Sequence, residues 1–329
     1  DVEGIDTDSA YMNPQRISAV VSYILEHFDQ KTKRHASFQY KERRVNGFNS
    51  LFATSSIKAA RAYYQEFKRQ QADLPEARRL SVGIIYSYAP NAEAPGTGLL
   101  AEESMDPSAL SQDDRAFLDE AIADYNKQFG ASFGTDASGF EGYYTSLSTA
   151  LAERRIDLVI VVDMFLTGFD SKSLNTLWVD KNLRAHGLIQ AFSRTNRILN
   201  SVKTFGNIVC FRNLEEATND AIALFGNKEA RGQVLLRPYG EYLSTYLEII
   251  EQLRIGFPLP IGSIASEKEQ KRFIDLMGQV LRLRNILTSF DDFEGDDTIA
   301  PRELEDYRSV YLDLYHEARE RSKAEKEPI

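Results

Sequence analysis

The 329-residue sequence has few of the side chains that build metal and redox sites. Its single cysteine, Cys210, can form no disulfide within the chain, which fits a reducing cytoplasm. Cys210 lies in the apolar run 207–211, so we interpret it as a core residue rather than a nucleophile. The four histidines are scattered without metal-ligand spacing, and we therefore predict no metal site.

Long apolar runs are also missing. No stretch approaches the ~18 apolar residues of a membrane span, and no signal-peptide pattern is present at the N-terminus. We therefore expect no membrane partner. Hydrophobic content of 43% and charged content of 27% are ordinary for a soluble protein, and the length predicts two compact domains.

The motifs that cradle nucleotide phosphates are absent as well. No Gly-x-x-x-x-Gly-Lys-Ser/Thr loop occurs, and no Asp-Glu-x-His box follows a strand. Gly96-x-Gly98-x-x-Ala101 imitates a dinucleotide fingerprint, but its glycines lie in a long loop with no helix beginning on them. A convincing nuclease cluster of carboxylates and lysine is likewise missing. The sequence predicts no complete catalytic site of its own.

Charge is unevenly distributed. The net charge of −10 argues against strong independent DNA binding. Residues 91–141 carry eleven acids and two bases, whereas residues 171–212 carry seven bases and one acid, so the acidic excess lies elsewhere than in the basic stretch. Residues 31–44 carry six bases and one acid. We interpret residues 29–46 as a polar loop, either an ordinary solvated surface or a binding surface.

Apolar patterning predicts an α/β region followed by helices. Asn13-Pro14 predicts a helix start, and Ser111 and Gly130 bound another helix. The predicted strands are 49–53, 80–86, 156–162, 174–181 and 207–211, and further helices are predicted after Ser56 to about Arg69 and at about 141–153. This order fits a parallel sheet covered by helices on both faces. Residues 239–254, 266–290 and 301–322 show helical spacing. We expect one domain over 1–213, with an N-terminal packing helix and an acidic insertion at about 89–142, and an all-α domain over 214–329.

The most informative stretch is residues 187–198. On a continuous helix, Gln190, Arg194 and Arg197 share one face. The apolar residues of the stretch fall on the opposite face: Leu188, Phe192 and Leu199. Guanidinium groups on a rigid helix suit a polyphosphate, because their planar donors match phosphate oxygens. A solvated amphipathic surface helix explains the same spacing.

A second informative stretch lies upstream. The apolar run 156–162 predicts a buried parallel strand, and it leads directly into the segment from Asp163 to Asp170. Polar groups at the carboxyl end of such a strand often bind ligands. Thr54, Ser55 and Ser56 follow another predicted strand, where hydroxyl groups suit an anion or simply cap the next helix.

These stretches together resemble a known family. Gln190-x-x-x-Arg194-x-x-Arg197 resembles motif VI of superfamily 2 helicases, and Asp163-x-x-x-x-Gly168-x-Asp170 resembles their motif V. The complete sequences of the two motifs closely resemble those of the motor subunit of type I restriction enzymes (HsdR), and the match extends over residues 156–213. Residues 48–67 are more weakly similar to motif IV.

The resemblance implies roles for particular residues. Arg194 and Arg197 would be arginine fingers that reach ATP across a cleft. Gln190 would contact nucleotide or bridge to the other lobe, and Asp170 would lie near the ribose or orient the arginines. Gly168 would lie near nucleotide and the DNA backbone. The other implied nucleic-acid contacts are Thr54, Ser55, Thr167, Lys181 and Arg184.

The implied protein is an ATP-dependent double-stranded DNA translocase, of which this chain is the second RecA-like lobe and a helical domain. Because the sequence starts at Asp1 without methionine, we expect an excised fragment. Because it lacks the phosphate loop and the acidic box that binds Mg²⁺, we expect it to be inactive alone. ATP and Mg²⁺ would bind in the intact subunit, with the Mg²⁺ ligands outside this fragment. Implied partners are the first RecA-like lobe and nuclease domain of the same subunit, and the methyltransferase and specificity subunits. Alternatives are another superfamily 2 motor, such as a type III restriction or repair helicase, and a non-catalytic docking module.

Overall fold

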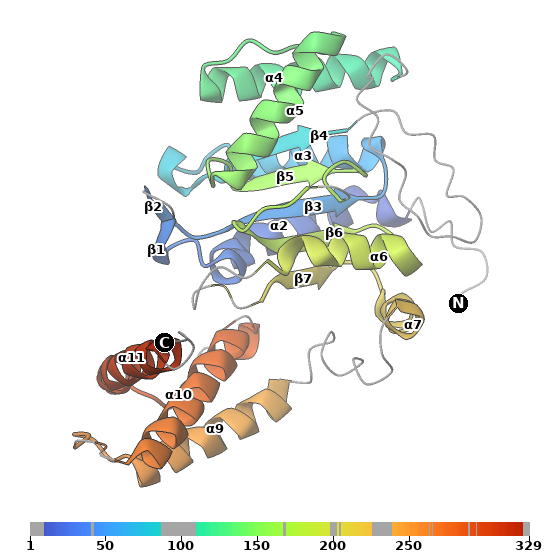
Figure 1. The fold of residues 1–329 in the computed structure, drawn as a ribbon. Coiled ribbons are helices and arrows are strands. Elements are labelled where there is room, and N and C mark those ends of the chain that lie inside the picture. The colour runs from blue at the N-terminus through green and yellow to red at the C-terminus, as the bar shows by residue number, and fades with distance from the viewer. Residues whose placement is uncertain are drawn as a thin grey trace. The chain divides into compact units, whose positions relative to one another are not determined.

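The computed structural model describes residues 10–40, 43–86, 110–166, 169–197, 203, 205–225, 239–262, 264, 266–288, 290–293 and 295–324 (Figure 1). The chain divides into two compact units, Asp1–Arg231 and Gly232–Ile329. The boundary lies later than the predicted division at 213/214. The reason is helix α7 (Glu215–Phe225), which packs against α6 and places Ala221 in the core of the first unit.

The first unit is built on a five-stranded parallel sheet. Its strands are β3 (Asn49–Thr54), β4 (Val82–Ile85), β5 (Leu158–Val161), β6 (Leu174–Asp180) and β7 (Asn207–Cys210), in the spatial order β4-β5-β3-β6-β7. Every residue of β3, β5 and β6 is buried, which explains the unbroken apolar sequence of β5 and the apolar centres of β3 and β6, whose ends carry polar residues. The predicted RecA-like α/β fold is confirmed, and each predicted strand is present with ends shifted by two residues or fewer.

Helices cover both faces of this sheet, as predicted. Figure 1 shows α2 (Pro14–Thr32) and α3 (Ile57–Gln71) behind the sheet, and α5 (Ala137–Ala152) and α6 (Ala185–Phe192) in front of it. Helix α4 (Gln112–Phe129) packs beside β4, and a 3₁₀ turn, η1 (Glu76–Arg78), precedes that strand. The part of the predicted acidic insertion that the structure describes, from residue 110 onward, is therefore integrated into the fold.

Local capping explains where the helices begin and end. The Asn13 side chain accepts a hydrogen bond from the Gln15 amide (2.8 Å), as the Asn-Pro start predicts. Gly130 ends α4 in the left-handed conformation (φ 66°). Helix α5 begins four residues before the predicted start, because Asp136 accepts from the Gly139 amide (3.0 Å) and caps it.

The prediction of a loop over 29–46 is wrong. Helix α2 continues to Thr32, and β1 (Ser37–Tyr40) pairs antiparallel with β2 (Arg43–Asn46). Gly47 follows β2 with φ 64°, its amide donates to the Ala36 carbonyl (2.7 Å), and a Cβ there would lie 2.3 Å from the Arg34 Cα atom. Each of the two strands has only four residues, the shortest length at which alternation indicates a strand, so the sequence pattern missed them.

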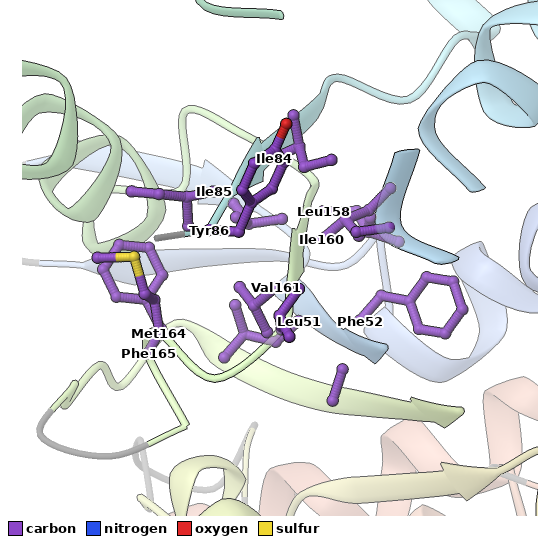
Figure 2. Packing of buried hydrophobic residues seen from close by; sticks show 14 of the residues in the cluster. Leu51, Phe52, Ile84, Ile85, Tyr86, Leu158, Ile160, Val161, Met164 and Phe165 are labelled. Atoms are coloured by element: carbon purple, nitrogen blue, oxygen red, sulfur yellow. The ribbon is translucent and has the colours of Figure 1, made fainter. Parts of the chain in front are cut away.

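The core of the first unit joins the sheet to the segment after β5. Figure 2 shows Leu51, Phe52 and Val161 from the central strands among the buried side chains. Met164 and Phe165, at the start of the β5–β6 connection, belong to the same cluster and are 2% and 0% exposed. That connection is therefore anchored in the core at its start.

Helix α2 is fixed to the sheet near both of its ends. The Lys31 carbonyl accepts hydrogen bonds from Asn175 Nδ2 (2.8 Å), Thr176 Oγ1 (3.2 Å) and Asn207 Nδ2 (2.7 Å), at the start of β6 and β7. At the other end of the helix, Arg16 binds the last residue of β6, as described below. Helix α2 thus spans the length of one central strand.

The second unit is helical, as predicted. Its elements are α9 (Tyr239–Gly256), α10 (Glu267–Leu287), the 3₁₀ turn η5 (Asp291–Phe293) and α11 (Pro301–Ala324), and α10 packs against both other helices. It has its own core, which includes Tyr246, Phe273 and Tyr307. In the described part of the chain, every helix is too short or too polar to cross a membrane.

Candidate functional site

The β5–β6 connection carries the residues of the motif V resemblance. It leaves the carboxyl end of β5, passes β3 and returns to the amino end of β6, because the three strands are parallel. Asp163 lies just after β5, whereas Asp170 lies four residues before β6. The structure therefore separates these two carboxylates into different groups of contacts. Thr167 and Gly168, both predicted site residues, lie outside the described residues.

The first group lies at the carboxyl edge of the sheet. The Lys181 ammonium donates to the Asp163 carboxylate and to the Val162 carbonyl (3.0 Å). Thr54 has no exposed surface, and its hydroxyl donates to the Val161 carbonyl (3.1 Å). Thr54 therefore supports the sheet rather than making the phosphate contact that we predicted, and the charge of Lys181 already has a partner.

Ser55 and Arg184 are the other predicted contacts at this edge. Ser55 is half-buried, and its neighbour Ser56 caps α3 by accepting from the Ala59 amide (3.1 Å). Arg184 is exposed at the start of α6, and its guanidinium makes no hydrogen bond or ion pair with the residues that the structure describes. At the carboxyl edge, Arg184 is therefore the predicted cation that still presents its charge to solvent.

The second group gathers the motif VI residues. Helix α6 ends at Phe192 and a 3₁₀ turn, η3 (Ser193–Thr195), follows, so the predicted continuous helix does not reach Arg197. Arg194 Nη1 donates to the Phe169 carbonyl (2.6 Å), and its Nε donates to the Gln190 carbonyl (3.0 Å). The single helical face that we predicted is therefore wrong beyond Gln190. The Gln190 side chain itself is half-buried.

Arg197 continues the same arrangement. Its Nε donates to Asp170 Oδ1 (2.8 Å), and the two side chains are 59% and 55% exposed. Two consecutive residues of the β5–β6 connection, Phe169 and Asp170, thus hold one arginine each. Leu188 is buried and Phe192 partly buried, as the pattern predicts, while Leu199 lies outside the described residues.

Backbone strain lies at the start of this connection. Phe165 adopts a left-handed conformation (φ 66°), which is costly for a residue with a bulky side chain. Its ring packs 5.0 Å from the rings of both Tyr144 and Phe169, measured between centroids. Buried aromatic contacts therefore maintain the strained turn, and they also fix the residue whose carbonyl binds Arg194.

Lys203 joins the second group without having been predicted. It is 2% exposed, and its ammonium donates to the Arg197 carbonyl (2.6 Å). Burial lowers the pKa of Lys203 to about 7, and the nearby charge of Asp170 opposes that shift. Lys203 is one of the seven basic residues of 171–212, but the sequence alone predicted no role for it.

A separate cluster surrounds Asp180, the last residue of β6. Its buried carboxylate accepts from Arg16 (2.7 and 3.0 Å), from Arg212 Nε (3.0 Å) and from the Tyr63 hydroxyl (2.6 Å). Burial alone would raise the pKa of Asp180, but the hydrogen bonds from Arg16, Tyr63 and Arg212 together lower it. Both guanidinium groups also lie over the Tyr11 ring, at 4.8 Å for Arg16 and 3.7 Å for Arg212. Arg212 is therefore engaged internally, and the number of basic residues in 171–212 overstates the free positive charge.

The interpretation of Cys210 as a core residue is wrong. Cys210 is exposed, because it ends β7, an edge strand that pairs only with β6 among the described strands. The other β7 residues are half-buried. An apolar run of four residues does not distinguish a central strand from an edge strand.

Comparison with known proteins identifies both units. Residues 46–213 match the family described as type I restriction enzyme subunit R domain 3. Residues 234–329 match the family described as type I restriction and modification enzyme, subunit R C terminal. The two matches together cover most of the chain.

Curated relatives agree with the family matches. The type I restriction enzyme SauCOLORF180P endonuclease subunit of Staphylococcus aureus (strain COL) is 34% identical over 335 residues, which cover 100% of this chain and 33% of the relative. The SsaAORF53P endonuclease subunit of Staphylococcus saprophyticus is 35% identical over 336 residues, which cover 100% of this chain and 34% of the relative. A putative MpnIIP endonuclease subunit N-terminal part from Mycoplasma pneumoniae is 38% identical over 172 residues, covering 50% of this chain and 46% of the relative. The chain thus spans about a third of the length of the staphylococcal relatives and belongs to the R subunits of type I restriction enzymes.

Proposed function

We propose that the first unit is the second motor lobe of an ATP-dependent DNA translocase within an intact R subunit that serves restriction. The carrying observation is the pair of arginines held by consecutive residues, Arg194 by Phe169 and Arg197 by Asp170. The RecA-like sheet and the family matches support the same assignment. Membership in this family also removes the type III restriction and repair helicases as alternatives.

The two arginines differ in what they can offer a nucleotide. Arg197 is more than half exposed, and its ion pair with Asp170 uses only Nε, so its outer nitrogens suit the oxygens of a polyphosphate. Arg194 is partly buried and donates to two carbonyls, which fixes the end of α6 to the connection. In the intact subunit, we propose that Arg197 stabilises charge on the transferred phosphoryl group and that Arg194 completes and supports that contact.

The arginine side chains of this site suit the phosphates of ATP, but the described residues of the site offer no set of ligands for the Mg²⁺ that accompanies ATP. In the described part of the chain, no three His, Cys, Asp or Glu side chains gather to hold a metal ion. The phosphate cradle and the Mg²⁺ ligands would come from the first RecA-like lobe, and the bound Mg²⁺ would neutralise phosphate charge there. The lobe alone is therefore proposed to be inactive as an ATPase.

The carboxyl edge is the proposed DNA side of the lobe. Arg184 and Ser55 are the predicted contacts that keep exposed surface there. Closing and opening of the two lobes around ATP would move these contacts along the DNA backbone. The second unit carries none of the motor motifs, and we propose that it docks the methyltransferase and specificity subunits.

The decisive experiment measures DNA-stimulated ATPase in the intact subunit. Arg197→Ala should lower turnover by roughly 10³-fold or more, as arginine fingers do, and Arg197→Lys should rescue poorly because an ammonium lacks the planar fork. Arg78→Ala is the matched control, since Arg78 is an exposed arginine in η1. Melting temperatures should stay within the range of surface substitutions. Near-normal turnover in both Arg194→Ala and Arg197→Ala would end the motor assignment of these residues.

A further inference from the structure

Lys203 occupies an unusual position for a lysine. It is 2% exposed, and lysine is rarely buried without a paired carboxylate. Its ammonium donates to the Arg197 carbonyl at 2.6 Å. Just beyond it, Gly206 approaches Thr195 so closely that a Cβ atom would lie 2.4 Å from the Thr195 carbonyl oxygen. Lys203 and Gly206 thus each make a close contact with the region of Thr195 to Arg197.

The charges around Lys203 are few. Asp170, from the β5–β6 connection, is the described group whose charge acts on Lys203. On its exposed side, the same carboxylate binds the Arg197 guanidinium. Lys33, at the end of α2, faces the neighbouring Phe205 ring at 5.9 Å from its centroid. Asp170 thus pairs directly with the exposed guanidinium and acts on the buried ammonium through its charge.

We propose that Lys203 is a positioning residue for Arg197, which fixes the Arg197 backbone and keeps the Lys203–Asp170–Arg197 group positively charged toward a polyphosphate. With Lys203 protonated, the group carries two positive charges and one negative charge. With Lys203 neutral, Asp170 is balanced by Arg197 alone, and the attraction of the group for phosphate weakens. This inference rests on the proposed function of Arg197.

The pH range of this effect follows from burial. Because the pKa of Lys203 lies near 7, the ammonium is charged below neutral pH and becomes neutral as the pH rises. A merely structural lysine, filling space beneath the surface, would give no such dependence. Apolar side chains of similar volume would fill the same space without the cost of burying a charge.

The first experiment follows the lysine side chains of the 329-residue chain by NMR after ¹³C labelling. The resonance that disappears in Lys203→Met should titrate near pH 7, apart from the other lysines. Its midpoint should fall in Asp170→Asn, because that carboxylate favours the ammonium form. A midpoint near the ordinary value for lysine, or one that Asp170→Asn leaves unchanged, overturns the inference.

The second experiment records ATPase against pH in the intact subunit. Wild-type turnover should fall above about pH 7, since each further pH unit leaves about tenfold less protonated lysine. Lys203→Arg should keep turnover at higher pH, because its guanidinium stays charged. Lys203→Met should lose roughly tenfold to a hundredfold below neutral pH and show no alkaline fall. Lys127→Met, at an exposed lysine of α4, is the control and should match wild type.

The outcomes separate this inference from the proposed function. If Arg197→Ala is inactive while Lys203→Met keeps the wild-type rate and pH profile, Lys203 does not position Arg197 and the motor assignment stands. If Arg197→Ala retains normal turnover, the motor assignment fails, and with it the role of Lys203. Should Lys203→Arg fail to fold, the Lys203→Met profile and the Asp170→Asn titration still decide.

Discussion

Asp170 lies just before β6 and Asp180 is the last residue of that strand. Each carboxylate binds arginine, but Asp180 is buried and Asp170 is exposed. Asp180 is 1% exposed and accepts from Arg16, Arg212 and Tyr63, which come from three other parts of the chain. The Asp170 side chain is 55% exposed and binds Arg197 through one oxygen. A buried carboxylate whose lone pairs are all satisfied stabilises the fold, whereas an exposed pair contributes little to stability and leaves its arginine able to move.

The difference shows that a carboxylate–arginine pair can have either a structural or a ligand-binding role. Burial and the number of donors decide whether the pair locks elements together or presents a guanidinium to a ligand. The arginines follow the same division, since the side chain of Arg212 is 5% exposed and that of Arg197 is 59% exposed. The comparison can be tested one residue at a time.

The largest effect on stability is expected from Asp180→Asn. Removing this charge leaves two guanidinium groups beside an uncharged amide, and breaking a buried pair in this way costs roughly 3–5 kcal/mol. Trp178 is the single tryptophan of the chain and is buried in β6, so its fluorescence reports unfolding of the first unit alone. Urea denaturation followed at Trp178 gives the difference. A midpoint equal to that of wild type would show that the cluster is not a stabilising centre.

Acid should reveal the same cluster in the wild-type chain. The folded-state pKa of Asp180 is lowered, so its pairing contributes stability that is fully present above the unfolded value of about 3.9 and is lost as the pH falls below it. The fluorescence midpoint of Asp180→Asn should therefore depend less on pH between about 5 and 2. Equal acid sensitivity in both proteins would assign acid unfolding to other carboxylates.

Tyr63→Phe removes one donor while keeping the buried ring. The Tyr63 hydroxyl lies 2.6 Å from Asp180 Oδ2, and hydrogen bonds to charged groups are worth about 1.5–3 kcal/mol. The loss should be smaller than in Asp180→Asn, because both arginines keep their carboxylate. The same urea experiment measures it. A loss as large as that of Asp180→Asn would mean that the hydroxyl, rather than the charge, organises the cluster.

Asp170→Asn should hardly change stability. An exposed ion pair typically contributes about 0.2–1 kcal/mol, and both partners here are more than half exposed. In the intact subunit, however, the substitution should lower ATPase, since it releases Arg197 from its ion pair and lowers the pKa of Lys203 further. Unfolding and turnover are measured on the same variant. A large loss of stability would place Asp170 with Asp180 and contradict the comparison.

The smallest effect is expected on DNA binding. Any binding by the 329-residue chain should be weak, independent of sequence and lost with modest salt, because the net charge is −10. Arg184→Ala should reduce the salt dependence by about one phosphate contact. Fluorescence anisotropy across a salt series measures this, with Arg78→Ala as the control. Tight binding that persists in high salt would contradict the assignment of the carboxyl edge.

The sequence predicted the elements whose signals are local. The buried strands each contain a short apolar run, and Asn13, Ser56 and Ser111 mark helix starts that the structure confirms. The end of α6 was not predictable in this way. Helical spacing continues through Arg197, but no capping residue marks the true end at Phe192.

The site itself was only partly predictable. Motif resemblance pointed to Asp170, Arg194 and Arg197. In the structure, Arg197 pairs with Asp170, whereas Arg194 donates to two backbone carbonyls and a hydroxyl. Backbone carbonyls leave no trace in a sequence. The Asp180 cluster joins residues that lie more than 30 positions from Asp180, and nothing in one sequence links them. Lys203 was missed because burial, not residue type, gives it its character.

Helix α2 has a mechanical consequence for the proposed motor function. Arg16 ties its first turn to the end of β6, and the Lys31 carbonyl ties its last turn to the start of that strand. Attachment at both ends opposes sliding or pivoting of the helix on the sheet. If the first unit is a motor lobe, as proposed, α2 would therefore brace the sheet and help the lobe to move as a rigid body.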